Sequence, residues 1–160
     1  MARKRIRGTD KVLRNLNREI KQIEGRTMKG LIRAGIIVLR DMDKTSPKIP
    51  VDERNLQASQ FLVATRGGVE RGSNPSFKGE NAERMQAEHS STLSREASAV
   101  AASKQPVVRL GFSANYAWYV HEMVGANFQR PGAGAKFFEA ALKRNQGKIL
   151  EIIRQEARIK

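Results

Sequence analysis

His121 and Glu122 form an adjacent acid–base pair of this 160-residue chain, and their residue types suggest catalysis. A histidine beside a carboxylate is a common arrangement for moving a proton to or from a substrate. The surrounding segment, 115–121, holds three of the nine aromatic residues and predicts a strand, in which neighbouring side chains point to opposite faces. Two groups on opposite faces cannot act on one substrate atom. We therefore expect a structural role for the pair, at a contact between subunits or loops.

Ligands for a metal or a cofactor are sparse. The chain has no cysteine and two histidines, His89 and His121, so disulfides, thiolate zinc sites and cysteine nucleophiles are excluded. Asp41 and Asp43 flank Met42, but they fall at the C-terminus of a predicted helix, where the helix dipole disfavours carboxylates. Phosphate-binding loops, nucleophile elbows and zinc-protease motifs are also missing from the sequence. We expect no catalytic residue, no metal and no cofactor, and hence a protein that is not an enzyme.

The aromatic residues Tyr116, Trp118 and Tyr119 have two interpretations. They could stack the bases of a single-stranded nucleic acid, but such platforms need interleaved cations, and no basic residue occurs between Arg109 and Arg130. The favoured interpretation is a sheet core with an exposed edge. The exposed part would then be a subunit interface, for which the candidates are Tyr116, Trp118, Tyr119, His121 and Glu122.

Positive charge dominates the chain, with a formal net charge of +14. Residues 1–50 contain fourteen basic and five acidic side chains, whereas residues 51–105 contain seven of each. The most basic stretch is residues 1–9, which we expect to be a mobile arm. Such an arm is typical of a contact with a polyanion, nucleic acid first. A solvated tail and a dock for an acidic protein remain alternatives. The candidate contacts with DNA or an acidic partner are Arg3, Lys4, Arg5, Arg7, Lys11 and Arg14.

Two amphipathic helices must position these residues. Apolar residues recur at steps of three and four from Leu13 to Met42, which predicts one long helix over about 10–43, with a bend or a close helix approach near Gly25. A second helix is predicted over about 135–157, after a glycine-rich loop from 124 to 135. The longest aliphatic run, 36–39, is far too short to cross a bilayer, and the N-terminal region lacks the apolar stretch of a secretory signal. We expect no membrane association.

Between these helices the pattern predicts a small antiparallel sheet. Strands are expected at 59–65, 106–112 and 115–121, with a short capped turn at 52–56 and a turn-rich segment at 67–79. Residues 80–103 predict a helix whose thin apolar stripe suits an insertion that packs on a neighbouring subunit. The fold class is α+β, with the helices on one face of the sheet. The domains are the arm 1–9 and a single domain, 10–160, with the insertion at about 67–105.

Three segments resemble a known family. They are Ser46-Pro-Lys-Ile-Pro-Val-Asp-Glu-Arg-Asn-Leu-Gln-Ala-Ser59, Asn115-Tyr-Ala-Trp-Tyr-Val-His-Glu122 and Gly132-Ala-Gly-Ala-Lys-Phe-Phe-Glu139. In this order, after a long N-terminal helix, they resemble the tail-completion or neck proteins of long-tailed bacteriophages, also labelled head-to-tail joining or minor capsid proteins. The first segment departs from the family pattern, because Asp52-Glu53-Arg54 stands where Thr-Gly is usual, and residues 67–105 lie outside the resemblance.

The resemblance implies a structural protein of the virion. Such a subunit would form a ring at the neck, around or near the DNA channel, after synthesis in the bacterial cytoplasm. Its partners would be copies of itself, portal-side or tail-tube proteins and double-stranded DNA. The alternative from another class is a free nucleic-acid-binding protein that uses the basic arm and helix.

Overall fold

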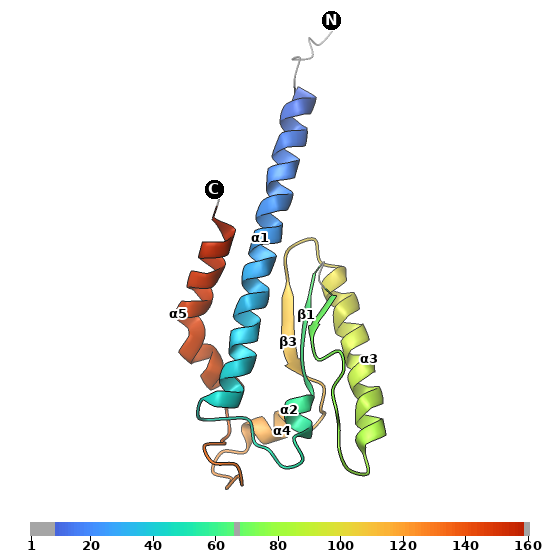
Figure 1. Ribbon diagram of the computed structural model, residues 1–160, viewed down its shortest axis with the longest axis vertical. Coiled ribbons are helices and arrows are strands. Elements are labelled where there is room, and N and C mark those ends of the chain that lie inside the picture. The colour runs from blue at the N-terminus through green and yellow to red at the C-terminus, as the bar shows by residue number, and fades with distance from the viewer. Residues whose placement is uncertain (1–8, 66–67, 159–160) are drawn as a thin grey trace, which may run out of the picture.

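The elements are arranged in layers across a long molecule. The computed structural model describes residues 9–65 and 68–158. In Figure 1 the C-terminal helix lies against the N-terminal helix, the N-terminal helix lies against the sheet, and a third helix covers the far side of the sheet. The α+β class is therefore confirmed, with a long N-terminal helix, a C-terminal helix and a small antiparallel sheet.

The two terminal helices form the first pair of layers. Helix α1 spans Thr9–Lys44 and helix α5 spans Phe137–Ala157, which confirms the helices expected at 10–43 and 135–157. Helix α1 runs without interruption through Gly25 (Figure 1). The close approach lies one turn later, at Gly30, where an added Cβ would stand 3.1 Å from the Ile153 Cα of α5.

The sheet has three antiparallel strands in the order β2-β1-β3. They are β1 (Gln60–Ala64), β2 (Gly68–Arg71) and β3 (Val108–Phe112), and Leu62 of β1 pairs with Leu110 of β3. The strands expected at 59–65 and 106–112 are confirmed. The third strand is not at 115–121 but at 68–71, inside the segment expected to consist of turns. Its residues (Gly-Val-Glu-Arg) are too few and too polar to show alternation, and pairing with β1 forms the strand.

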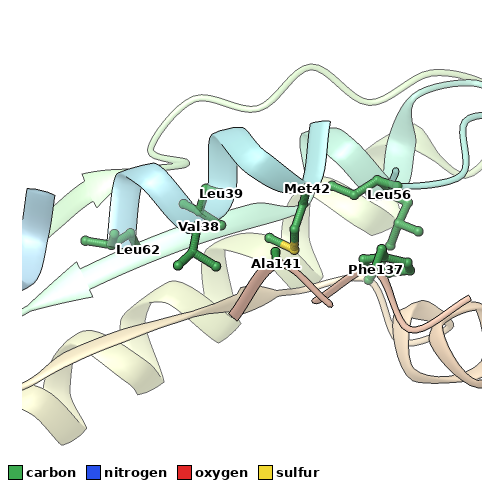
Figure 2. Packing of buried hydrophobic residues seen from close by; sticks show 9 residues of the cluster. Val38, Leu39, Met42, Leu56, Leu62, Phe137 and Ala141 are labelled. Carbon is green, nitrogen blue, oxygen red and sulfur yellow. The ribbon is translucent and has the colours of Figure 1, made fainter. Parts of the chain in front are cut away.

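The main core lies between α1, α5 and one face of the sheet. Figure 2 shows Val38, Leu39 and Met42 of α1 in one cluster with Leu62, and the Met42 side chain points toward Ala141. Phe137 and Ala141 of α5 close the same cluster near Leu56. These side chains are nearly inaccessible to solvent, and burial of each large aliphatic side chain contributes about 1.5–3 kcal/mol.

The opposite face of β1 is also covered. Helix α3 (Ala82–Ala101) packs there, and its Leu93 and Val100 form a second buried cluster with Phe61 and Val63. Because side chains alternate along a strand, Phe61 and Val63 face α3 while Leu62 faces α1. The expectation that helices cover one face of the sheet is wrong. The apolar stripe of 80–103 is buried against the chain's own sheet instead of being presented to a neighbouring subunit.

The end of the molecule farthest from the start of α1 is formed by short elements (Figure 1). Helix α2 (Asn55–Ala58) replaces the capped turn expected at 52–56, and no side chain caps it. Arg54 precedes it with a φ of 68°, the left-handed conformation that glycine adopts most easily. Helix α4 (Ala117–Glu122) and the 123–136 loop complete this end, where Arg130 donates hydrogen bonds to the carbonyl oxygens of Ile49 and Asp43.

Candidate subunit interface

Helix α4 presents the aromatic residues that were expected in a strand. Ala117 and Val120 pack against the main core, whereas Trp118 is 74% exposed and Tyr119 is 67% exposed. Residues three apart share a helix face, so fixing Ala117 and Val120 inward turns Trp118 and Tyr119 to solvent. The strand at 115–121 is wrong because two inward residues three positions apart need a helical turn, and aromatic content alone does not reveal that spacing.

The exposed apolar surface continues beyond the helix. Val124, two residues past the end of α4, is 75% exposed. We call Trp118, Tyr119 and Val124 the base patch. Its two large aromatic residues are of the types enriched in the centre of protein interfaces.

Glu122 connects α4 to the start of α5. Its carboxylate accepts a hydrogen bond from the Lys136 ammonium and lies 2.9 Å from Nδ1 of His121. The Lys136 hydrogen bond, followed by that of His121, holds the pKa of Glu122 below its usual range. The backbone N–H of Lys136 also donates to the carbonyl oxygen of His121, at 2.8 Å. These contacts fix the position of α4 against the N-terminus of α5.

His121 and Glu122 are in contact, contrary to the opposite faces that a strand would give them. The imidazole ring packs edge-on against Phe137, with centroids 5.1 Å apart, and beside the Trp118 ring at 6.5 Å. Its second nitrogen, Nε2, is buried and has no hydrogen-bond partner within the described residues. The nitrogen that would serve a substrate is therefore inaccessible.

A cleft of about 390 Å³ opens beside this helix. Tyr116, Val120 and Phe128 form its apolar wall, and Asp52 and Glu53 stand at its rim. Burial raises the pKa of the Tyr116 hydroxyl, and the charges of the two carboxylates raise it further. Tyr116 is 37% exposed and lines this cleft two residues before Trp118 of the base patch.

A second group of exposed apolar side chains lies on α1. The N-terminal part of this helix extends past the end of α5 and past the sheet (Figure 1). Its side chains from Leu13 to Gln22 are exposed, among them Leu13, Leu16 and Ile20. We call these three residues the tip stripe. They follow the line of apolar residues that packs into the core farther along α1, so the same face is covered in one half of the helix and bare in the other.

His89 is a buried polar residue of α3. Its Nε2 lies 2.5 Å from the Gly72 carbonyl oxygen and its Nδ1 lies 2.6 Å from the Ser113 hydroxyl. A carbonyl oxygen only accepts, so Nε2 carries the hydrogen and Nδ1 accepts from the serine. His89 thus joins α3 to the ends of β2 and β3, with no free nitrogen left for a ligand.

The two aspartates at the end of α1 have separate surroundings. Asp41 accepts from the Arg144 guanidinium of α5, at 2.6 and 3.0 Å. Burial raises the pKa of Asp43, and a hydrogen bond from Gln57 and the charges of Arg71 and Arg130 partly oppose that effect. Within residues 9–65 and 68–158, no group of three or more acidic or histidine side chains could hold a metal ion. In the same ranges, no helix is long and apolar enough to cross a membrane.

The structure brings the predicted interface residues together and divides the predicted basic residues. Tyr116, Trp118, Tyr119, His121 and Glu122 all lie on or beside α4. Lys11 and Arg14 are exposed on the free part of α1, while Arg3, Lys4, Arg5 and Arg7 lie outside the described residues. The sequence reasoning missed the tip stripe, because it treated the apolar positions of α1 as a single core-facing stripe.

Comparison with models of protein families, with curated proteins and with solved structures found no match.

Proposed function

We propose that this chain is a structural subunit of the neck of a long-tailed bacteriophage, which completes the head–tail junction by assembling with its own copies. The resemblance of residues 115–122 and 132–139 to neck proteins supports this proposal. The same segments form α4, Lys136 and the first turn of α5, which hold the base patch in place.

One observation carries the assembly part of the proposal. Among the described residues, exposed apolar side chains gather at opposite ends of a long molecule, in the tip stripe on α1 and in the base patch beside α4 (Figure 1). Contact between two different surfaces is heterologous, and it gives a closed ring when the rotation between successive copies closes. In the proposed ring, the tip stripe of one copy packs on the base patch of the next.

Mixing two assembly-deficient variants tests this arrangement. Leu16→Asp with Ile20→Asp removes the tip stripe, and Trp118→Asp with Tyr119→Asp removes the base patch. Each variant alone should be monomeric by light scattering coupled to size-exclusion chromatography. An equimolar mixture keeps one intact tip and one intact base, so it should give a dimer that stops growing.

The control is Leu150→Asp, which replaces an exposed leucine of α5 outside both surfaces. This variant should assemble as the wild type does. A mixture that stays monomeric contradicts the tip-to-base contact. A wild-type chain that binds duplex DNA but remains a monomer at every concentration supports the alternative, a free nucleic-acid-binding protein.

A further inference from the structure

The free part of α1 carries a line of positive charge on one face. The cations are Lys11, Arg14, Arg18 and Lys21, all exposed, at spacings of three, four and three residues. Residues three and four apart on a helix are neighbours. Arg14, Arg18 and Lys21 line one shallow hollow of about 400 Å³ together with Asn17 and Gln22, which places them on a common face.

We propose that this basic stripe, Lys11, Arg14, Arg18 and Lys21, binds the phosphate backbone of duplex DNA. The inference deepens the proposed function by naming a nucleic-acid contact of the subunit. It adds Arg18 and Lys21 to the expected contacts Lys11 and Arg14. It also specifies which face of α1 would contact the DNA.

The stripe is opposite the apolar surface of the same helix. At about 100° per residue, the four cations centre about 160° from the line of Leu13, Leu16 and Ile20 with Ile23. The acidic residues of this stretch, Glu19 and Glu24, lie about 100° or more from the centre of the stripe by the same count. A protein neighbour on the apolar side therefore leaves the cations uncovered, and the helix can contact protein and DNA simultaneously.

The positive charge on this part of α1 is not paired with α5. Farther along the helix, Lys29 and Arg33 form ion pairs with Glu156 of α5. The stripe lies beyond the end of α5, and no ion pair is recorded for its four cations among the described residues. From Lys11 to Lys21 the stripe is about 15 Å long, which spans several phosphates of a duplex, since each strand carries one per 3.4 Å or so of axis.

The alternative polyanion is a membrane surface, which also attracts basic amphipathic helices. Membrane-bound helices carry lysine and arginine on their polar face and place aromatic and aliphatic residues in the lipid. The apolar side of the free part of α1 has aliphatic residues but no aromatic residue. The lack of an aromatic anchor favours DNA.

Fluorescence anisotropy with a labelled duplex of arbitrary sequence, read over a salt series, tests the proposal on the full-length chain. The test variant is Arg14→Gln with Arg18→Gln. The matched control is Arg84→Gln with Arg95→Gln, which removes two exposed arginines from α3. Both pairs remove two charges, so net charge alone cannot separate them. Arg14→Lys with Arg18→Lys keeps the positive charge and tests whether charge is sufficient for binding.

The stripe variant should bind the duplex on the order of 10- to 100-fold more weakly at 0.1 M salt. Its plot of log affinity against log salt should be about 1.8 less steep, because each lost phosphate contact removes about 0.9 from the slope. The control variant and the lysine variant should stay within about threefold of the wild type, as expected for non-specific phosphate contacts.

Equal losses in the stripe and control variants would overturn the proposal, as would a weaker affinity with an unchanged slope. Wild-type binding to vesicles rich in phosphatidylserine that also depends on Arg14 and Arg18 would assign the stripe to a membrane instead. The proposed function is tested separately, because the oligomer mass of the wild type and of the stripe variant is measured without DNA. If the stripe variant forms the same oligomer and binds DNA as well as the wild type, the DNA-binding role of the stripe is contradicted and the proposed assembly is not.

Discussion

Gly35 of α1 lies so close to Leu62 of β1 that a Cβ on the glycine would stand 2.6 Å from the leucine Cδ1. Leu62 is completely buried, and Leu110 of the neighbouring strand is also within reach of that Cβ. The absence of a side chain at Gly35 therefore sets how closely α1 approaches the sheet.

Replacing Gly35 with valine should lower the free energy of unfolding by about 1–3 kcal/mol, the usual cost of overpacking a core. Gly25→Val is the matched control, because a Cβ at Gly25 meets no atom within 4 Å. That control should change stability by about 0.5 kcal/mol or less. Urea unfolding followed by circular dichroism measures both, and an equal effect at the two glycines would contradict the close contact.

Arg54 provides the opposite case, a side chain where glycine would be favoured. Its φ of 68° lies in the left-handed region, which costs a residue with a Cβ about 1–2 kcal/mol. Arg54→Gly should therefore raise the free energy of unfolding by about 0.5–1 kcal/mol. The same change in the middle of a helix, Arg95→Gly in α3, should lower it by about 1 kcal/mol. Thermal unfolding of the two variants should shift in opposite directions, and a parallel shift would count against the turn geometry.

His89→Ala should destabilise the chain by about 3 kcal/mol, because it leaves a cavity and removes the partners of the Gly72 carbonyl and the Ser113 hydroxyl. Ser90 is the next residue of α3 and is exposed, so Ser90→Ala should stay within about 0.5 kcal/mol. Chemical denaturation of both variants makes the comparison. A His89 variant as stable as the Ser90 variant would mean that the imidazole does not join α3 to the strands.

Arg144→Ala should cost about 1–3 kcal/mol, the range for a hydrogen-bonded charge pair that is partly shielded from solvent. The guanidinium donates to Asp41 and to the Ser46 carbonyl oxygen, which ties α5 to the end of α1. Lys143→Ala breaks only the exposed pair with Glu139 and should leave the stability nearly unchanged. Arg144→Lys should also lose most of the stability, because an ammonium cannot reproduce the planar fork.

The pH dependence of α4 follows from Glu122. Since the folded-state pKa of this carboxyl is lowered, chiefly by Lys136, its contacts contribute stability above the ordinary carboxyl range and are lost as pH falls through the folded pKa. Trp118 is the one tryptophan of the sequence, and its ring lies beside His121. Its emission should therefore change at a pH below 4.5, the ordinary value for a glutamate.

Two variants test the cause of that transition. Glu122→Gln should remove it, and Lys136→Met should move its midpoint upward, because the largest stabilising contact of the carboxylate is gone. A midpoint that is the same in the Lys136 variant and the wild type would show that Lys136 does not hold the charge of Glu122.

The sequence was sufficient for the long elements and insufficient for the short ones. The apolar periodicity of α1 and α5 extends over several turns, so it identifies both helices to within about two residues of their observed ends. Helix α4 has six residues, and its aromatic and β-branched content resembles a strand until Ala117 and Val120 are known to face the core. Strand β2 is four residues long and exists through its pairing with β1.

The candidate interface could be predicted by residue type but not by geometry. Tyr116, Trp118 and Tyr119 stood out as an aromatic group, and they do lie together at the surface. The tip stripe could not be separated from the core positions of α1, because Leu16 and Val38 have the same periodicity and differ only in what packs against them. The tertiary packing determines where α5 ends relative to α1. That end point decides which leucines of α1 are exposed to solvent.

The uninterrupted course of α1 has a mechanical consequence. Its 36 residues make a rod about 54 Å long, with one end embedded between α5 and the sheet and the other end free. A tilt of about 10° at the embedded end displaces the free end by roughly 9 Å, by the length of the rod. The helix is a lever, so a small adjustment in the body can bring the tip to partners at different radii, and a partner that holds the tip sets the orientation of the whole subunit.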